Sequence, residues 1–253
     1  MKLRKPLYSV YERNLVAGIP AERLPKHVGV MVDGNRRWAA LMGQTTQHGH
    51  QAGAARIQEF LGWCRELGID VVTLYMLSTE NLSRPAEELT DLLGIIEELL
   101  TGLADSRVAR LQPVGALELL PEGLAATLER ATESTAEVEG LHVNIAVGYG
   151  GRQEIVDAVR ELLRDAAREG REIADLAETL GAEDIENYLY TRGQPDPDLV
   201  IRTSGEQRLS GFMMWQSAYS EFYFCEALWP DFRKVDFLRA LRDYAGRQRR
   251  FGS

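Results

Sequence analysis

The sequence is poor in cysteine and has no long apolar stretch. Cys64 and Cys225 are the only cysteines among 253 residues, and two isolated cysteines make neither a zinc pattern nor a disulfide framework. We expect both to pack as small buried hydrophobes. The longest apolar runs fall far below the roughly 18 residues that a membrane span needs. The basic N-terminus lacks the apolar core of a signal peptide, and we therefore expect a cytoplasmic protein.

Basic residues are also fewer than acidic residues. The chain has 29 Lys and Arg against 38 Asp and Glu, a formal net charge of −9. A protein that holds a nucleic-acid backbone by counterion release is usually basic, so we expect no nucleic-acid partner. A local cationic pocket on an acidic body better suits a small phosphorylated ligand. The sequence contains no Walker loop and no G-x-G-x-x-G after a strand.

Short β-branched runs alternate with longer helical patterns along the chain. Strands are predicted at 27–32, 71–77, 143–149, 198–203 and 221–225, with a weaker candidate at 114–120. Helices are predicted at about 50–67, 86–104, from 152 onward and at 235–245. This order implies parallel βαβ units in an α/β fold of one domain, residues 25–253. Residues 1–24 form an amphipathic arm, expected to pack on the body or on a second subunit.

Polar segments follow four of these strands: DGNRRW, STENLSR, GYGGR and SGEQRLS. In open α/β sheets, ligands bind beyond the carboxyl ends of the strands. We therefore expect these four segments to converge on one pocket.

The first segment places an acid beside two arginines. Asp33 closes a buried strand, Gly34 permits a close approach by a ligand, and Asn35, Arg36 and Arg37 open a short helix whose free N–H groups favour anions. A simple ion pair is the alternative interpretation. The position at a strand end favours a functional site.

Two further segments add anion-binding groups. Ser78, Asn81 and Arg84 precede a helix. The competing explanation for this stretch is helix capping by Ser83, with Glu87 as its reciprocal partner. Arg202 and Arg208 flank a Ser-Gly turn before Ser210, and two guanidinium forks with a hydroxyl suit a diphosphate. Glu221 and His50 are further candidates: a buried acid needs a partner or a metal, and His50 stands before a long helix. Two acids, several arginines and no nucleophile with an adjacent base favour diphosphate handling with a divalent cation.

Five co-linear segments, HVGVMVDGNRRWA, GHQAGA, LYMLSTENLSRP, NIAVGYGGR and DLVIRTSGEQRLSGFMMWQSAYSEFYF, resemble those of the cis-prenyltransferases, the family of undecaprenyl and Z-farnesyl diphosphate synthases. The resemblance runs from about residue 25 to 252. It is greatest to the short-chain actinobacterial Z,E-farnesyl diphosphate synthases. It implies a six-stranded, largely parallel sheet ringed by helices, with a hydrophobic tunnel. It further implies a homodimer that condenses isopentenyl diphosphate with an allylic diphosphate such as geranyl diphosphate.

The resemblance also implies roles for individual residues. Asp33 would bind Mg²⁺, and Glu221 would complete the metal site. The cradle of the allylic diphosphate would comprise Gly34, Asn35, Arg36, Arg37, His50 and Arg84. Asn35, Ser78 and Asn81 would lie near the reacting carbons and the departing proton. Arg202, Arg208 and Ser210 would hold isopentenyl diphosphate, and Arg250 and Gly252 match an R-x-G ending that reaches the partner's site. Trp38, Phe60, Leu74 and Ile145 are candidates for the tunnel wall, and equally for the core.

Met76 stands where long-chain members carry a small residue. A larger side chain at a tunnel wall would stop growth of the product, so we expect a short product, farnesyl in length. A long-chain synthase that makes the cell-wall carrier lipid, with contact to a membrane through its product, is the alternative. A non-catalytic partner subunit is another. A phosphohydrolase that uses Asp33 as nucleophile lacks the second acid, because Asn35 occupies that position.

Overall fold

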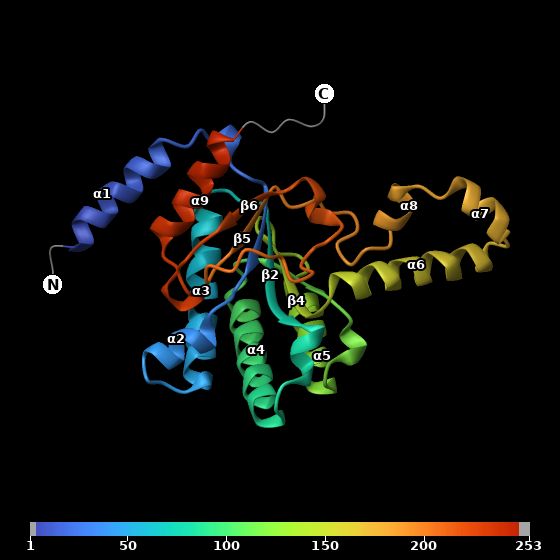
Figure 1. Cartoon of the computed structure of the whole chain (residues 1–253), viewed down its shortest axis with the longest axis horizontal. Coiled ribbons are helices and arrows are strands. Elements are labelled where there is room, and N and C mark those ends of the chain that lie inside the picture. Colours follow the sequence, from blue (N-terminus) through green and yellow to red (C-terminus); the bar gives the residue numbers. More distant parts are fainter. Residues whose placement is uncertain (1–3, 248–253) are drawn as a thin grey trace.

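The structure, a computed structural model, describes residues 4–247, with side chains from residue 11 onward. Six strands form one sheet in the order β3-β4-β2-β1-β5-β6 (Figure 1). They are β1 His27–Met31, β2 Val71–Ser78, β3 Arg110–Val114, β4 His142–Tyr149, β5 Leu199–Arg202 and β6 Glu221–Phe224. Every neighbouring pair is parallel, which confirms the predicted parallel α/β sheet.

The weaker strand prediction, at 114–120, is wrong. The strand lies at Arg110–Val114, and Leu117–Leu119 forms a 3-10 turn. Gly115 ends the strand at a φ of 145°, and a Cβ there would lie 2.2 Å from the carbonyl oxygen of Val147. Pro113 argues against a strand in the sequence, because proline is disfavoured in the interior of a sheet. It is tolerated here because β3 is an edge strand.

Nine α-helices surround the sheet in the described part of the chain. They are α1 Arg4–Ala17, α2 Asn35–Leu41, α3 Thr46–Glu66, α4 Ala86–Ser106, α5 Glu122–Thr135, α6 Gly151–Arg168, α7 Ile173–Thr179, α8 Ala182–Glu186 and α9 Lys234–Gly246. The sequence did not predict α5, α7 or α8. Among the residues described, no helix is both long enough and apolar enough to cross a membrane.

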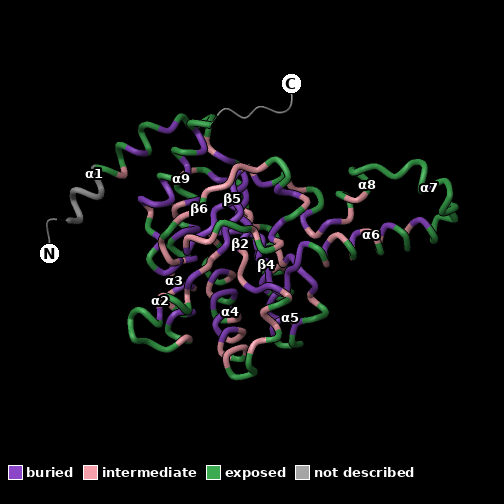
Figure 2. Tube along the Cα trace, viewed as in Figure 1, coloured by how far each residue is buried: buried purple, intermediate pink, exposed green. Residues whose placement is uncertain are grey.

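Both faces of the sheet are covered, which explains why its strands are apolar nearly throughout. On one face, Val30 and Leu74 share a core with residues of α3, α4, α5 and α9. On the other, Met31 packs with Tyr149 and Phe212. Figure 2 shows this buried centre, whereas much of α6, α7 and α8 is exposed.

The strand that ends in Ser78 changes its pairing before it reaches the pocket. Its register with β4 shifts between Tyr75 and Leu77 and again between Leu77 and Ser78. Tyr75 packs with Phe212 on one face of the sheet, whereas Met76 packs against the core on the other. Irregular pairing of this kind commonly redirects side chains next to a binding site.

The N-terminal arm packs on α9 of the same chain. Leu15 is buried, and the guanidinium of Arg239 lies 5.7 Å from the ring of Tyr11. Figure 1 shows the first turns of α1 extending away from the body. On the opposite side of the molecule, α6 also extends outward, with α7 and α8 beside it.

Candidate functional site

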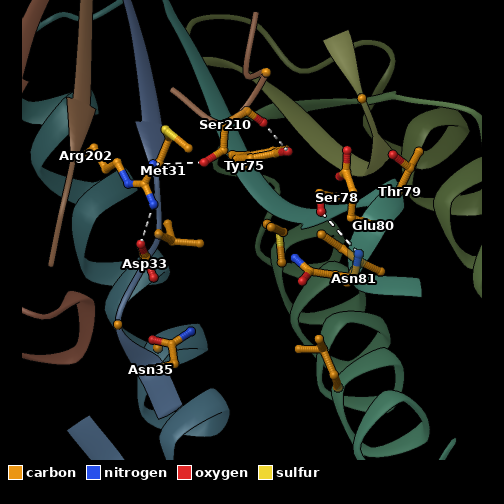
Figure 3. A pocket seen from close by; sticks show the side chains of 18 of the residues that line it. Met31, Asp33, Asn35, Tyr75, Ser78, Thr79, Glu80, Asn81, Arg202 and Ser210 are labelled. Atoms are coloured by element: carbon orange, nitrogen blue, oxygen red, sulfur yellow. Dashed lines mark hydrogen bonds and ion pairs between the residues drawn. The ribbon is translucent and has the colours of Figure 1, made fainter. Parts of the chain in front are cut away.

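A pocket with a volume of about 1320 Å³ opens at the carboxyl ends of the central strands. Its lining includes residues that directly follow β1 and β4, the last residues of β2, and the last residue of β5 with part of the loop after it. In Figure 3, Asp33 and Arg202 lie on one side and Ser78 and Asn81 on the other, with Tyr75 between them. The convergence expected from the sequence is therefore present.

Asp33 is the centre of a hydrogen-bonded cluster. Its Oδ2 accepts hydrogen bonds from Arg202 Nη2 at 2.8 Å and from Ser204 Oγ at 2.9 Å. Its Oδ1 lies 3.6 Å from Arg37 Nη2. Burial raises the pKa of the Asp33 carboxyl, but the contacts with Arg202, Ser204 and Arg37 outweigh burial, and the net pKa is lowered. Asp33 is therefore an ionised carboxylate at neutral pH.

Arg202 ties Asp33 to the loop that follows β5. The residue is only 5% exposed, and its Nη1 donates to the carbonyl oxygen of Arg208 and, at 3.1 Å, to Ser210 Oγ. Ser210 itself has a positive φ of 47°. The side chain of Arg208 is exposed and pairs with Glu206. One buried arginine thus positions a loop that presents a second, accessible arginine.

Asn35 is packed where α2 meets α3. A Cβ on Gly53 would lie 2.5 Å from Asn35 Oδ1, and one on Gly49 would lie 2.4 Å from the Asn35 carbonyl oxygen. The two glycines therefore let α3 approach α2 closely. Asn35 Oδ1 is buried and has no hydrogen-bond partner among the described residues.

The segment after β2 forms a second hydrogen-bonded group. Ser78 Oγ accepts from the backbone N–H of Asn81 at 3.2 Å. The capping of α4 predicted for Ser83 is wrong: no side chain caps that helix, and Ser83 Oγ donates to the carbonyl oxygen of Glu80 at 2.7 Å. Asn81 Oδ1 accepts two hydrogen bonds from Arg84, at 3.0 and 3.2 Å. Arg84 Nη1 also pairs with Glu88 at 3.1 Å, and Glu88 lies 3.5 Å from Arg36. These contacts hold Asn81 and Arg84 in place where they line the pocket.

His50 lines the pocket from α3. It is 7% exposed, and neither ring nitrogen has a hydrogen-bond partner among the described residues. Burial, with the nearby charge of Arg84, lowers the pKa of His50 to about 4. Its imidazole is therefore neutral at physiological pH and available to a ligand.

The pocket continues into an apolar end. Met76 lies there with Ile57 of α3 and with residues of α4. The α4 residues are Leu92, Ile95, Ile96 and Leu99. From Leu92 to Leu99 the helix rises by seven residue steps, or roughly 10 Å. The site thus combines a polar, cationic entrance with an apolar interior.

The structure brings most of the predicted site residues together. Those that line the pocket are Asp33, Gly34, Asn35, Arg36, Arg37, His50, Met76, Ser78, Asn81, Arg84, Arg202, Arg208 and Ser210. Arg250 and Gly252 lie outside the described residues.

The structure does not bring the other predicted residues to the pocket. Trp38 stacks on His48, with 5.9 Å between the ring centroids, and does not line the cavity. Phe60, Leu74 and Ile145 are fully buried in the core and do not line the cavity, so of the two interpretations left open for them the core is the correct one.

Glu221 is not beside Asp33. It begins β6, where it pairs in register with Leu199, whereas Arg202 pairs with Met31, two residues before Asp33. That places the two acids roughly 15 Å apart along the strand direction. Glu221 instead forms an ion pair with Arg247 at 2.6 Å. A metal site shared by Asp33 and Glu221 is therefore not formed within one chain, because the residues lie toward opposite ends of a parallel sheet.

Sequence reasoning missed several lining residues. Arg152, in the GYGGR segment, lines the pocket at the start of α6, and Tyr75 and Glu206 line it as well. The position of Arg152 after a strand was a usable signal. The apolar residues of α4 gave no such signal, because an apolar helix face has the same sequence pattern whether it covers a core or a cavity.

The Asp33 carboxylate fits a divalent cation. Within the described residues, the nearest charged partner of Oδ1 is Arg37 Nη2, at 3.6 Å. Mg²⁺ is commonly held by one or two carboxylates together with substrate phosphates and water. No cluster of three or more His, Cys, Asp or Glu suited to a metal occurs in the described chain. A cation here would therefore depend on oxygens supplied by a bound phosphate.

Comparison with known proteins identifies relatives that all have names of prenyl diphosphate synthases or isoprenyl transferases. A family model described as "Putative undecaprenyl diphosphate synthase" matches residues 31–252. The chain is 57% identical over 251 residues to isoprenyl transferase 1 of Streptomyces avermitilis, covering 99% of this chain and 98% of that protein. It is 58% identical to the (2Z,6E)-farnesyl diphosphate synthase of Thermobifida fusca, with the same coverage. It is 53% identical to the short-chain Z-isoprenyl diphosphate synthase of Mycobacterium bovis, covering 99% and 97%.

A solved structure has the same fold. Lavandulyl diphosphate synthase from Lavandula x intermedia, in complex with dimethylallyl diphosphate, superimposes with a TM-score of 0.86 at 35% identity, covering 92% of this chain and 100% of that one. The family match, the relatives and this shared fold agree over nearly the whole length. The chain therefore belongs to the undecaprenyl diphosphate synthase family, the cis-prenyltransferases.

Proposed function

We propose that the protein is a short-chain Z-prenyl diphosphate synthase. It condenses isopentenyl diphosphate with an allylic diphosphate, forms a Z double bond and releases diphosphate. The observation that carries this proposal is the composition of one pocket, in which a cationic entrance leads to an apolar interior. The names of the Thermobifida fusca and Mycobacterium bovis relatives support it.

The entrance suits ionisation of the allylic substrate. As the carbon–oxygen bond breaks, negative charge builds on the leaving diphosphate, and donors already aimed at that charge lower the barrier. Arg36, Arg37 and Arg84 supply such donors, and His50 contributes a neutral imidazole. When bound at Asp33, Mg²⁺ would add a further positive charge to the leaving group.

The loop after β5 suits the second diphosphate. Arg208 and Ser210 hold isopentenyl diphosphate, while Arg202 fixes their loop against Asp33. Asn35 and Asn81 flank the space between the two diphosphates and orient the reacting carbons. The proton lost from isopentenyl diphosphate passes to a nearby oxygen acceptor, for which Ser78 and the bound diphosphate are the candidates.

The apolar interior has two functions in this proposal. It excludes water, which would otherwise capture the allylic cation. It also limits the product, because Met76 narrows the space beside α4. The lavandulyl diphosphate synthase neighbour is described with the five-carbon dimethylallyl diphosphate, a short allylic diphosphate. A product of farnesyl length from geranyl diphosphate fits this space.

Two alternatives make different products. A long-chain synthase would extend the same primer through many condensations, and a non-catalytic subunit would make none. The intact set of Asp33, Arg37, Arg84 and Arg202 argues against the second, since a structural subunit has no need of them. Incubation of the pure protein with Mg²⁺, labelled isopentenyl diphosphate and geranyl diphosphate separates all three by product length.

A homodimer in the cytoplasm is part of the proposal. β6 is an edge strand, and Phe224 on it and the adjacent Tyr219 are 38% and 78% exposed. Apolar side chains at a free sheet edge suit burial against a second copy. Contact with a membrane would arise only through the product. Light scattering coupled to gel filtration tests the dimer: a mass near twice 28.4 kDa supports it, and a monomer mass contradicts it.

A further inference from the structure

One acid in the pocket has no place in the chemistry described above. Glu206 lies in the loop after β5 and lines the cavity. Each of its carboxylate oxygens contacts a different arginine: Oε1 lies 3.5 Å from Arg37 Nη1, and Oε2 pairs with Arg208 Nη1. The same carboxylate thus joins an arginine assigned to the allylic diphosphate with one assigned to isopentenyl diphosphate.

An acid at this position opposes the binding of anions. A diphosphate at either arginine would bring several negative charges close to Glu206, and like charges at short range repel. The diphosphate must also compete with Glu206 for the same guanidinium N–H groups. Glu206 therefore lowers the affinity of the pocket for the ligands that the arginines attract.

Groups other than Glu206 also hold the Arg37 side chain and the backbone of Arg208. Arg37 Nη1 also donates to the carbonyl oxygen of Ser204 at 3.4 Å, and its Nη2 lies 3.6 Å from Asp33 Oδ1. The backbone of Arg208 is held by the hydrogen bond from Arg202 to its carbonyl oxygen. Removal of the carboxylate charge would therefore leave Arg37 at the pocket and the loop that carries Arg208 in place.

We propose that the Glu206 carboxylate forms ion pairs with Arg37 and Arg208 when no phosphate is bound. It gives way to a bound diphosphate and pairs with the two arginines again when diphosphate leaves. The proposal rests on the proposed function. It makes Glu206 a positioning residue whose effect is on release: by competing with product diphosphate, it keeps the pocket from being blocked after each condensation. The cost is weaker binding of any single diphosphate.

The test is direct binding of inorganic diphosphate, measured by isothermal titration calorimetry in the presence of Mg²⁺. Glu206→Gln keeps the shape of the side chain and removes its charge. The matched control is Glu161→Gln, because Glu161 likewise contacts two arginines, Arg164 at 3.1 Å and Arg168 at 3.3 Å, but lies on α6 outside the pocket. Circular dichroism confirms that the variants are folded, and Glu206→Ala serves as a second variant.

Glu206→Gln is expected to bind diphosphate about three- to tenfold more tightly than the parent protein, the range for loss of two partly exposed ion pairs. Diphosphate should then be a stronger product inhibitor of the variant by the same factor, and Glu161→Gln should match the parent. Equal or weaker binding by Glu206→Gln, with normal binding by the parent, would overturn this inference and leave the proposed function standing. Absence of diphosphate binding by the parent protein would overturn both.

Discussion

The side chain of Asn35 lies directly against the backbone of Gly53. A Cβ at Gly53 would be only 2.5 Å from Asn35 Oδ1 and 2.8 Å from Nδ2. The contact joins α3 to the first residue of α2 and fixes the amide at the pocket wall. The backbone of Gly53 is ordinary helix, which any residue can adopt. Glycine is required because there is no room for a Cβ beside Asn35.

Gly53→Ala should therefore displace Asn35 and impair catalysis. A misplacement of about 1 Å in a reacting group can cost roughly 100-fold in rate, and we expect a loss of that order in kcat/KM. Gly62→Ala, in the same helix, is the control, because a Cβ at Gly62 meets nothing within 4 Å. That change should leave the rate unaltered and raise the free energy of unfolding by about 0.5–1 kcal/mol. Equal rates for the two variants would remove Asn35 from the mechanism.

Asp33→Asn should reduce turnover by roughly 100- to 1000-fold, the usual effect of removing one electrostatic contact at a transition state. The variant would also leave the buried Arg202 guanidinium without its carboxylate, at a cost of about 1–3 kcal/mol in the free energy of unfolding. Steady-state rates at saturating Mg²⁺ and urea unfolding measure the two effects. Asp243→Asn, which breaks a surface pair with Arg247, is the control. A near-normal rate for Asp33→Asn would contradict the proposed role.

Much of the site could be predicted because of where its residues fall in the chain. Asp33, Ser78 and Arg202 each stand at the end of a strand, and a parallel sheet necessarily brings such ends to one edge. The alternation of strand and helix implied that sheet. The five motifs together then identified the family.

The errors have physical causes. Glu221 also stands next to a strand, but at its beginning, and a sequence pattern does not show which end of a strand faces the pocket. Phe60 and Trp38 are as apolar as Met76, and only the three-dimensional packing separates residues that face a cavity from residues that face the core. The role of Glu206 depends on contacts with Arg37, 169 positions away in the chain, which no local pattern could indicate.

Stability should fall as the pH is lowered, partly because of His27. Its Nδ1 lies 2.7 Å from the Pro195 carbonyl oxygen and its Nε2 lies 2.8 Å from Thr73 Oγ1. Burial lowers the pKa of His27 to about 4, below the ordinary value of 6.5. Between these values the unfolded chain binds more protons than the folded one, so acid favours unfolding. From pH 7 to pH 5, His27 alone should reduce the free energy of unfolding by about 2 kcal/mol.

His27→Gln tests this contribution, because glutamine can donate and accept hydrogen bonds but does not titrate. Urea unfolding at pH 7 and pH 5 should give a difference about 2 kcal/mol smaller for the variant than for the parent protein. His50, whose pKa is shifted in the same direction, is present in both proteins and cancels in the comparison. An unchanged pH dependence would mean that His27 titrates normally.

Met76→Ala should lengthen the product. The substitution opens space beside Ile96 and Leu99 of α4, where the apolar end of the pocket lies. We expect products longer by one or more isoprene units, measured by mass spectrometry after removal of the diphosphate. Leu74→Ala is the control, since Leu74 is buried in the core and does not line the pocket; it should destabilise the fold by about 2–5 kcal/mol without a longer product. An unchanged product from Met76→Ala would exclude the side chain as the limit.

The most direct test of the central claim is the identity of the product made by the pure protein from isopentenyl diphosphate and geranyl diphosphate with Mg²⁺. Chromatography against Z,E and E,E standards, with mass spectrometry, gives both chain length and geometry. We predict one major product of farnesyl length with a Z double bond in the newly added unit. A ladder of long-chain products, an all-E product or no condensation would contradict the account.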